Sequence, residues 1–334
     1  MSGWKSMLNE CPVEWLLEKE NPSVRYFTLA DILGKTADSQ EVIEAKRGIM
    51  RDGLVPRILE KQNPGGYWGK PEDFYMRSKF KGTAWTLILL AWLGADGEDP
   101  RIRKACEFIL DSSRHSSGGF AYKGAGEGGG DTKYIIPCLT GNMAWSLIKL
   151  GCLGDSRVKE SIDFIARYQR FDDSVKVPPR GWPYDNLEKC WGRHTCHMGV
   201  VKSLKALAAI PEDKRSTAVK AAIDEGMEYL LKHHIFKRSH NLSKVSKPEW
   251  LHFGFPLMYE TNVLEILDIM TGLGTHDERM QEAVDLVMSK QDRNGRWIQD
   301  NARSGRYIVG VERNGLPGKW VTLQALRVLR SYYG

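Results

Sequence analysis

The stretch Thr83-Ala-Trp-Thr-Leu-Ile-Leu-Leu-Ala-Trp-Leu-Gly94 is apolar on nearly every face, which is typical of a helix that is buried all round. A Gly-aromatic turn, Gln62-Asn-Pro-Gly-Gly-Tyr-Trp68, precedes it. Residues 100–110 follow it and place apolar side chains on one side and charged side chains on the other. Together these three pieces predict a helical hairpin with one buried helix and one amphipathic helix.

The same phrase recurs along the chain. Three further Gly-aromatic turns read Ser117-Gly-Gly-Phe120, Arg180-Gly-Trp182 and Gln291-Asp-Arg-Asn-Gly-Arg-Trp297. Leu-Gly pairs end several apolar runs; Gly34, Gly94 and Gly154 lie 60 residues apart, and Gly274 lies two such periods further on. A fixed period of this kind indicates a repeat architecture. We interpret the glycines and tryptophans of the turns as structural rather than as a stacking site for sugars or bases.

The order of the runs predicts an all-α fold. Apolar runs lie at 23–34, 81–94, 140–154, 194–210, 258–274 and 318–333. Amphipathic runs lie at 4–19, 40–62, 99–113, 155–170, 213–235 and 277–291. Six helices of each kind in strict alternation favour a closed double ring with the apolar set inside. An open solenoid would also alternate, but it would not explain inner helices that are apolar on both sides.

Composition indicates a soluble globular protein. The 334 residues are 42% apolar and 27% charged, with a net charge of +6. Because basic and acidic residues are interleaved, we expect no nucleic-acid partner. We see no signal peptide, no transmembrane run and no Pro/Ser-rich linker, so we predict one domain over residues 1–334 in the cytoplasm. Its six scattered cysteines are expected to be free thiols.

The turns, the phrase Gly82-Thr-Ala-Trp-Thr-Leu87 and the opening Trp15-Leu-Leu with Asn21-Pro-Ser-Val-Arg-Tyr26 resemble the terpenoid cyclase and protein prenyltransferase superfamily. The resemblance covers roughly residues 10–333 and implies an (α/α)6 toroid with a central apolar cavity that opens at one end. It also implies an isoprenoid ligand. The fourth repeat is degenerate, with a longer basic loop at 236–256.

The two catalytic motifs of that superfamily are incomplete here. The Asp-x-Asp-Asp acid motif of the cyclases is missing, and Glu260 at the start of the fifth apolar run is the best remaining candidate for a proton donor. In the prenyltransferase branch, which this chain resembles, an Asp-x-Cys pair on one inner helix and a histidine on the next form a zinc site. Arg193-His-Thr-Cys196 matches the histidine phrase, so His194 is a candidate catalytic residue, but no Asp-x-Cys precedes it. Whether the protein is an enzyme therefore stays open.

A local zinc site is an alternative in the same segment. Cys190, His194 and His197 stand at i, i+4 and i+7, and Asp185 would supply a fourth ligand. Thiolate and imidazole are good zinc ligands, and three protein ligands would leave a position open for chemistry. The competing interpretation is that these are hydrogen-bonded residues at the start of an inner helix.

A basic segment before the second apolar run predicts a site for a prenyl diphosphate. Its residues Arg77, Lys79 and Lys81 would face the cavity mouth and pair with the diphosphate, with Mg²⁺ as a companion ion. Aromatic side chains expected to line the cavity are Trp85, Trp145, Tyr259 and Trp320. Ordinary solubilising charges at a loop–helix junction would give the same pattern.

Three functions remain open on this basis. The first is binding of an isoprenoid in the central cavity, with or without cyclisation or prenyl transfer. The second is a carbohydrate-active enzyme, which would need paired carboxylates, for which Asp131, Asp185 and Glu260 are candidates. The third is a non-catalytic toroid that binds a protein or lipid partner.

Overall fold

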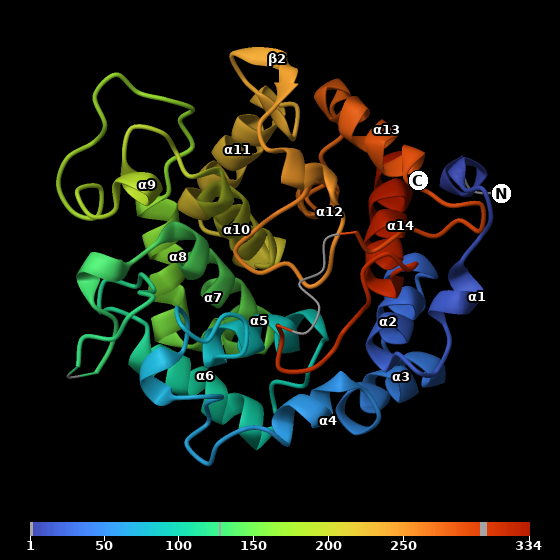
Figure 1. The fold of residues 1–334 in the computed structure, drawn as a ribbon, viewed down its shortest axis with the longest axis horizontal. Helices are drawn as coiled ribbons and strands as arrows, with labels where there is room; N and C mark the ends of the chain where they lie inside the picture. The colour runs from blue at the N-terminus through green and yellow to red at the C-terminus, as the bar shows by residue number, and fades with distance from the viewer. Residues whose placement is uncertain (1–2, 127, 301–305) are drawn as a thin grey trace.

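The computed structural model describes residues 3–126, 128–300 and 306–334, and its helices form two concentric rings (Figure 1). The inner helices are the apolar runs of the sequence. Their bounds are α2 Pro22–Phe27, continued by η2 Thr28–Ile32, α5 Thr83–Trp92, α7 Pro137–Lys149, α10 His197–Ala208, α12 Val263–Gly272 and α14 Lys319–Tyr333. Every residue of α5 is buried, as the apolar run from 83 predicts.

The amphipathic runs form the outer ring. Their bounds are α3 Gln40–Arg51 with α4 Leu54–Leu59, α6 Pro100–Ser112, α8 Ser156–Tyr168, α11 Thr217–Lys232, and η8 Glu278–Met280 with α13 Gln281–Ser289. Side-chain caps define where several of them start. The Asp99 and Asp155 carboxylates accept hydrogen bonds at 2.8 Å from the backbone N–H groups of Arg101 and Arg157, which satisfies donors that a helix start leaves open.

The double ring is closed, so the open solenoid is excluded. Neighbouring inner helices contact one another in the order α2, α14, α12, α10, α7 and α5. The turn after α5 returns to α2, since a Cβ added at Gly94 would lie 3.0 Å from the Phe27 ring. The two ends of the chain meet at the seam, where η1 Gly3–Met7 contacts α14. An ion pair joins Arg327 to Asp31 there, and Lys319 pairs with Glu18 at 2.6 Å. The fold is therefore an all-α, (α/α)6-type toroid.

The repeated turns fasten each outer helix to the next inner helix. The indole N–H groups of Trp68 and Trp297 donate to the backbone carbonyls of Ile58 and Val287, at 2.9 and 2.7 Å. The backbone N–H groups of Trp68, Phe120 and Trp297 donate to threonine hydroxyls at the start of the following inner helix: Thr83, Thr140 and Thr322. Both indoles are fully buried, which confirms their structural role.

Glycine is required in these turns for two physical reasons. Gly66 and Gly118 have φ of +87° and +95°, which side chains rarely adopt. A Cβ at Gly66 would also lie 2.6 Å from the Lys104 carbonyl oxygen, and one at Gly118 would lie 2.3 Å from that of Glu160. The Gly181 turn is looser, since nothing lies within 4 Å of its added Cβ.

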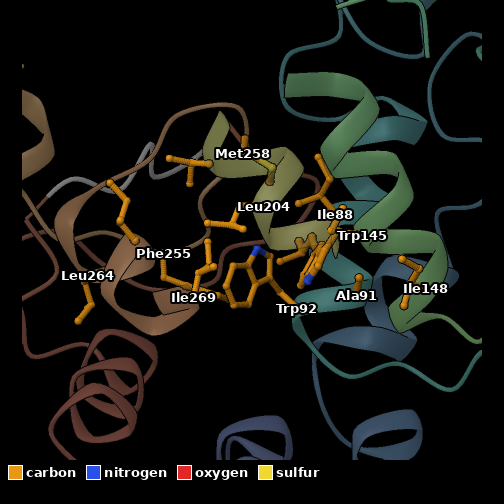
Figure 2. Close-up of a cluster of buried hydrophobic side chains, with 14 of the residues drawn as sticks. Ile88, Ala91, Trp92, Trp145, Ile148, Leu204, Phe255, Met258, Leu264 and Ile269 are labelled. Carbon is orange, nitrogen blue, oxygen red and sulfur yellow. The ribbon is translucent and has the colours of Figure 1, made fainter. Parts of the chain in front are cut away.

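The expected open cavity at the centre of the ring is filled by side chains. The segment before α12 enters the ring and buries Phe255 and Met258, which Figure 2 shows next to the inner helices. The Phe255 ring lies 5.6 Å from Trp92 and 4.3 Å from Trp320. Aromatic packing therefore separates the two ends of the toroid. The sequence signal for this was the apolar character of residues 253–258, which we assigned to the longer loop and to a helix start.

Two predicted runs and the basic loop differ in detail from the structure. Residues 4–19 contain only η1 and the four-residue helix α1 Val13–Leu16. The 40–62 run is broken at Gly53, where an added Cβ would lie 2.9 Å from Pro22. The basic loop after α11 forms a small hairpin, β1 Lys237–Arg238 and β2 Asn241–Val245, followed by η7 Pro248–Leu251.

The connections between the rings also contain short helical elements. These are η3 Pro71–Asp73, η4 Thr132–Tyr134, η5 Cys152–Gly154, α9 Glu188–Trp191 and η6 Glu212–Lys214.

Within the part of the chain that the structure describes, no helix combines the length and the apolar character needed to cross a membrane.

Candidate functional site

One cavity, which we call the mouth cavity, opens where the inner helices begin. Its volume is about 470 Å³. It is lined by residues from the segments before α5, α7, α10 and α12 and from the first turn of α7: Tyr75, Met76, Lys79, Tyr122, Ile136, Cys138, Leu187, Glu188, Lys189, Cys190 and Tyr259. Aromatic, aliphatic and sulfur-containing side chains make most of this wall. The cavity thus has the size and lining typical of a site for a small apolar molecule.

Two of the predicted ligand-binding residues meet at this cavity. The Lys79 ammonium lies 4.7 Å from the centroid of the Tyr259 ring, in a cation–π contact. Lys79 is exposed, whereas Tyr259 is half-buried. Lys189 adds a second positive charge to the lining, and Glu188 is the one carboxylate among the described residues there. Its Oε1 accepts a long hydrogen bond from the Arg193 backbone N–H at 3.4 Å.

The other predicted ligand-binding residues lie elsewhere. Arg77 and Lys81 are exposed on the loop before α5. Trp85 is fully buried, with its ring stacked on Tyr75 at 4.2 Å, and Trp320 is fully buried against Phe255. Trp145 lines a different cavity at the opposite end of the ring. The expectation that these four aromatic side chains line one cavity is therefore wrong.

The structure does not bring the four candidate zinc ligands together. Among the described residues, no three His, Cys, Asp or Glu side chains are grouped so that they could hold a metal ion. Cys190 lines the mouth cavity, and the Asp185 carboxylate accepts a hydrogen bond from the Gly181 backbone N–H at 2.8 Å. His194 is exposed on the connection before α10. Burial raises the pKa of the Cys190 thiol to about 12, which disfavours the thiolate that zinc requires.

His197 packs instead against the outer wall. Its ring lies 4.3 Å from Trp250 and 5.3 Å from His233. Burial, His233 and Lys247 hold the pKa of His197 well below its usual range, so the imidazole is neutral. His197 thus lies at the start of an inner helix, as in the competing interpretation, but its buried Nε2 has no hydrogen-bond partner among the described residues.

The candidate carboxylates of the sequence are separate as well. Glu260 is half-buried and lies three residues before α12, which Asn262 caps. Asp131 caps η4 by accepting from the Lys133 backbone N–H at 3.0 Å. Neither residue lines the mouth cavity, and Asp185 belongs to the turn described above. The structure therefore shows no pair of these carboxylates facing one cleft.

A second cavity, which we call the base cavity, lies toward the opposite ends of the inner helices. Its volume is about 310 Å³. Its charged and aromatic wall consists of Phe27, Asp31, Trp92, Trp145, Lys149, Lys205, Glu265, Asp268 and Arg327. Of this set, only Trp145 is predicted from the sequence to line a binding cavity. The base cavity thus combines six charged side chains with an aromatic and aliphatic wall.

An ion-pair network with two lysines and one carboxylate forms one side of the base cavity. The Lys202 ammonium lies 2.8 and 2.6 Å from the two carboxylate oxygens of Glu265, and the Lys205 ammonium lies 3.1 Å from Oε1. The three side chains are at most 5% exposed. Burial alone would raise the pKa of Glu265, but attraction by Lys202 and Lys205 outweighs it and lowers the pKa.

Lys205 also sits between two indole rings. Its Nζ lies 3.8 Å from the Trp92 centroid and 3.7 Å from the Trp145 centroid. Burial lowers the pKa of Lys205, Glu265 raises it and Lys202 lowers it again, so that the pKa is about 7. Burial is the largest cause, and the single Glu265 carboxylate, which is shared with Lys202, offsets it only in part. A part of the Lys205 side chains is therefore neutral at physiological pH.

Two further charged groups, Lys149 and Asp268, reach the base cavity. Among the described residues neither has an ion-pair partner within 4 Å, but Asp31 and Asp268 attract Lys149, and Arg327 and Lys205 attract Asp268. Burial raises the pKa of Asp268, which keeps more of this carboxyl protonated, and burial lowers the pKa of Lys149. Arg327, by contrast, is engaged with Asp31 and lies over the Phe27 ring.

Sequence reasoning missed this cluster because its members come from five helical segments. A signal was present in Val200-Val-Lys-Ser-Leu-Lys205, where two lysines three residues apart interrupt an apolar inner run. Glu265 and Asp268 interrupt the next inner run in the same way. Because buried charges are paired, these four interruptions predict an internal network once the runs are known to be adjacent.

Comparisons with known proteins give no family assignment. No family model matches the chain, and no curated protein matches it in sequence. Solved structures with similar helical architecture include the type II terpene cyclase MstE from Scytonema, at 15% identity and a TM-score of 0.44, covering 93% of this chain and 87% of that chain. An unsaturated glucuronyl hydrolase specific for heparin aligns at 11% identity and a TM-score of 0.48, covering 93% and 85%.

A family 105 glycoside hydrolase of C. acetobutylicum ATCC 824 aligns at 13% identity and a TM-score of 0.47, covering 99% of both chains. These neighbours belong to two different classes of enzyme. At such low identity, neither class transfers its activity or its catalytic residues to this chain.

Proposed function

We propose that the protein binds a small isoprenoid-type molecule in the mouth cavity, with an anionic end group next to Lys79 and Lys189. The observation that carries this proposal is the lining of the 470 Å³ cavity, which is largely aromatic and aliphatic. Burying apolar surface contributes about 25 cal/mol per Å² removed from water, so such a wall favours an apolar chain over a sugar.

The position of charge supports the same ligand. Lys79 and Lys189 outnumber Glu188 in the lining, and Lys79 is exposed to water. An ammonium at the rim can pair with a diphosphate or carboxylate while the chain enters the apolar wall. Mg²⁺ would accompany a diphosphate in this arrangement, held by the diphosphate oxygens and water rather than by a protein cage.

Binding, rather than cyclisation, is the activity that this wall supports. A protonating cyclase needs a carboxylic acid directed at the apolar chain. Glu188, the one carboxylate among the described lining residues, is turned toward the Arg193 backbone. Cys138 and Cys190 have raised pKa values because of burial, so they are protonated thiols that complete an apolar surface.

The test is thermal melting of the purified protein with farnesyl diphosphate, farnesol, inorganic pyrophosphate and an oligosaccharide, each with and without Mg²⁺. Ligand at a hundredfold over its dissociation constant should stabilise the protein by about 2.7 kcal/mol. Farnesyl diphosphate should give the largest shift. The variant Ile136→Trp, which fills the cavity, should abolish it, whereas Leu242→Trp on exposed β2 should not.

Two outcomes would contradict the proposal. A flat response to farnesyl diphosphate and farnesol would reject the isoprenoid ligand and favour a protein or lipid partner. A shift with the oligosaccharide alone would favour the carbohydrate-active alternative.

A further inference from the structure

The base cavity contains a lysine in an unusual setting. Lys205 is 5% exposed, lies between the Trp92 and Trp145 rings, and shares the single carboxylate of Glu265 with Lys202. The group nevertheless lines a cavity of about 310 Å³ and is accessible from it. A purely structural ion pair would not need the second lysine or the cavity.

We propose that Lys205 is a nucleophilic amine that forms an imine with a small aldehyde or ketone bound in the base cavity. This inference is independent of the isoprenoid site, which lies at the other end of the ring. An amine next to a second cation is a known way to keep a lysine neutral and reactive.

The step balances within the cavity. The nitrogen lone pair of neutral Lys205 attacks the carbonyl carbon, and the carbonyl π pair moves to oxygen, which takes up the proton that the attacking nitrogen releases. The resulting carbinolamine loses its hydroxyl group as water when that oxygen is protonated again, and a carbon–nitrogen double bond forms. The product is an iminium or imine plus one water, and no oxidant or reductant is needed.

Asp268 is placed to donate the proton that water formation requires. It lines the same cavity, it interacts electrostatically with Lys205, and burial raises the pKa of its carboxyl group. A raised pKa increases the protonated fraction of a carboxyl group, and this is the form that can act as a general acid. Arg327 and Lys205 attract this carboxyl group, but its side chain lines the cavity, so a substrate oxygen bound there can reach it.

The aromatic walls stabilise the product. An iminium carries its positive charge where the ammonium was, between the faces of Trp92 and Trp145 and beside Glu265. Ring faces attract such cations. The two ring faces and Glu265 therefore stabilise positive charge at this nitrogen in the iminium as they do in the ammonium.

Lys149 indicates the class of carbonyl compound. This ammonium lines the cavity and is attracted by Asp31 and Asp268, but among the described residues it has no ion-pair partner within 4 Å. An anionic substituent on the substrate would supply that partner. The matching substrate is a small aldehyde or ketone that also carries a carboxylate.

The experiment traps the imine in the folded protein. The full chain is incubated at pH 7 with limiting glyoxylate and sodium cyanoborohydride, and labelled lysines are mapped by peptide mass spectrometry. Lys205 should carry at least about tenfold more label than exposed Lys220 on α11, since each pKa unit changes the neutral fraction tenfold. Equal or lower labelling of Lys205 in the wild-type protein would overturn the proposal, even where variants fail to fold.

Variants separate reactivity from structure. Lys205→Arg should remove the adduct, and Lys220→Arg should leave it unchanged. Lys149→Met should reduce labelling by glyoxylate but not by acetaldehyde, which lacks the carboxylate. Lys202→Met removes the neighbouring cation, so the pH at which Lys205 is half-maximally labelled should rise from about 7. A pH profile that does not move in Lys202→Met would also contradict the proposal.

Discussion

The Phe255 ring stacks on the Trp320 ring with centroids 4.3 Å apart and planes inclined by 8°. Phe255 belongs to the segment before α12, whereas Trp320 begins α14, so the contact ties a connecting segment to the inner ring. The Trp92 ring lies 5.6 Å from Phe255 on the other side. This packing closes the centre of the toroid and leaves separate cavities at its two ends.

Replacing Phe255 by alanine should destabilise the protein by about 3–5 kcal/mol, because the change removes a fully packed ring and leaves a void. The measurement is denaturant unfolding followed by circular dichroism. Leu242→Ala, on exposed β2, is the matched control and should cost well under 1 kcal/mol. A cost for Phe255→Ala similar to that of the control would show that the centre is not packed as described.

The indole N–H groups of the turn tryptophans should contribute unequally to the free energy of unfolding. Trp68→Phe keeps the ring but leaves the Ile58 carbonyl without its 2.9 Å donor, which should cost about 1–3 kcal/mol. Trp182→Phe should cost less, because the Trp182 indole N–H is buried without a partner. Melting of both variants side by side tests this order. The reverse order would mean that the Trp68 bond is not part of the repeat's stabilisation.

The stability contribution of Lys205 should depend on pH. Its pKa is about 7 in the folded state and ordinary in the unfolded state, so between these values the unfolded chain binds more protons. Stability contributed by this group therefore rises as pH increases from about 7 toward 10. The difference in melting temperature, wild type minus Lys205→Met, should increase between pH 6 and pH 9. A difference that is constant or falls with pH would place the Lys205 pKa outside this window.

Removing the rim charge should weaken binding of a charged ligand only. Lys79→Ala should reduce the affinity for farnesyl diphosphate roughly fivefold, about 1 kcal/mol for an exposed charge contact. Farnesol, which lacks the anionic group, should bind the variant and the wild type alike. Isothermal calorimetry at low and high salt measures both, and the loss should shrink at high salt. An equal loss for both ligands would indicate that Lys79 acts by packing against Tyr259.

The two cavities show which parts of a site can be predicted from sequence patterns. The basic segment before α5 and Tyr259 were placed near a mouth, and Lys79 and Tyr259 do meet there. Cys190, His194 and His197 have helical spacing, but α9 ends at Trp191 and α10 begins at His197, so the three do not share one helix face. Glu265, which carries the internal network, received no role because its partners Lys202 and Lys205 are about sixty residues away.

The sequence by itself determined the periodic part of this protein: apolar and amphipathic runs in alternation, Gly-aromatic turns between them, and therefore two rings of helices. These features depend on local spacing and on burial, which produce a pattern of apolar residues and glycines that repeats along the sequence. Only the tertiary structure decided that Phe255 and Met258 fill the centre and that Lys205 lies between Trp92 and Trp145. The physical reason is that cavities and buried charge networks are formed by side chains from distant helices, whose approach no local pattern records.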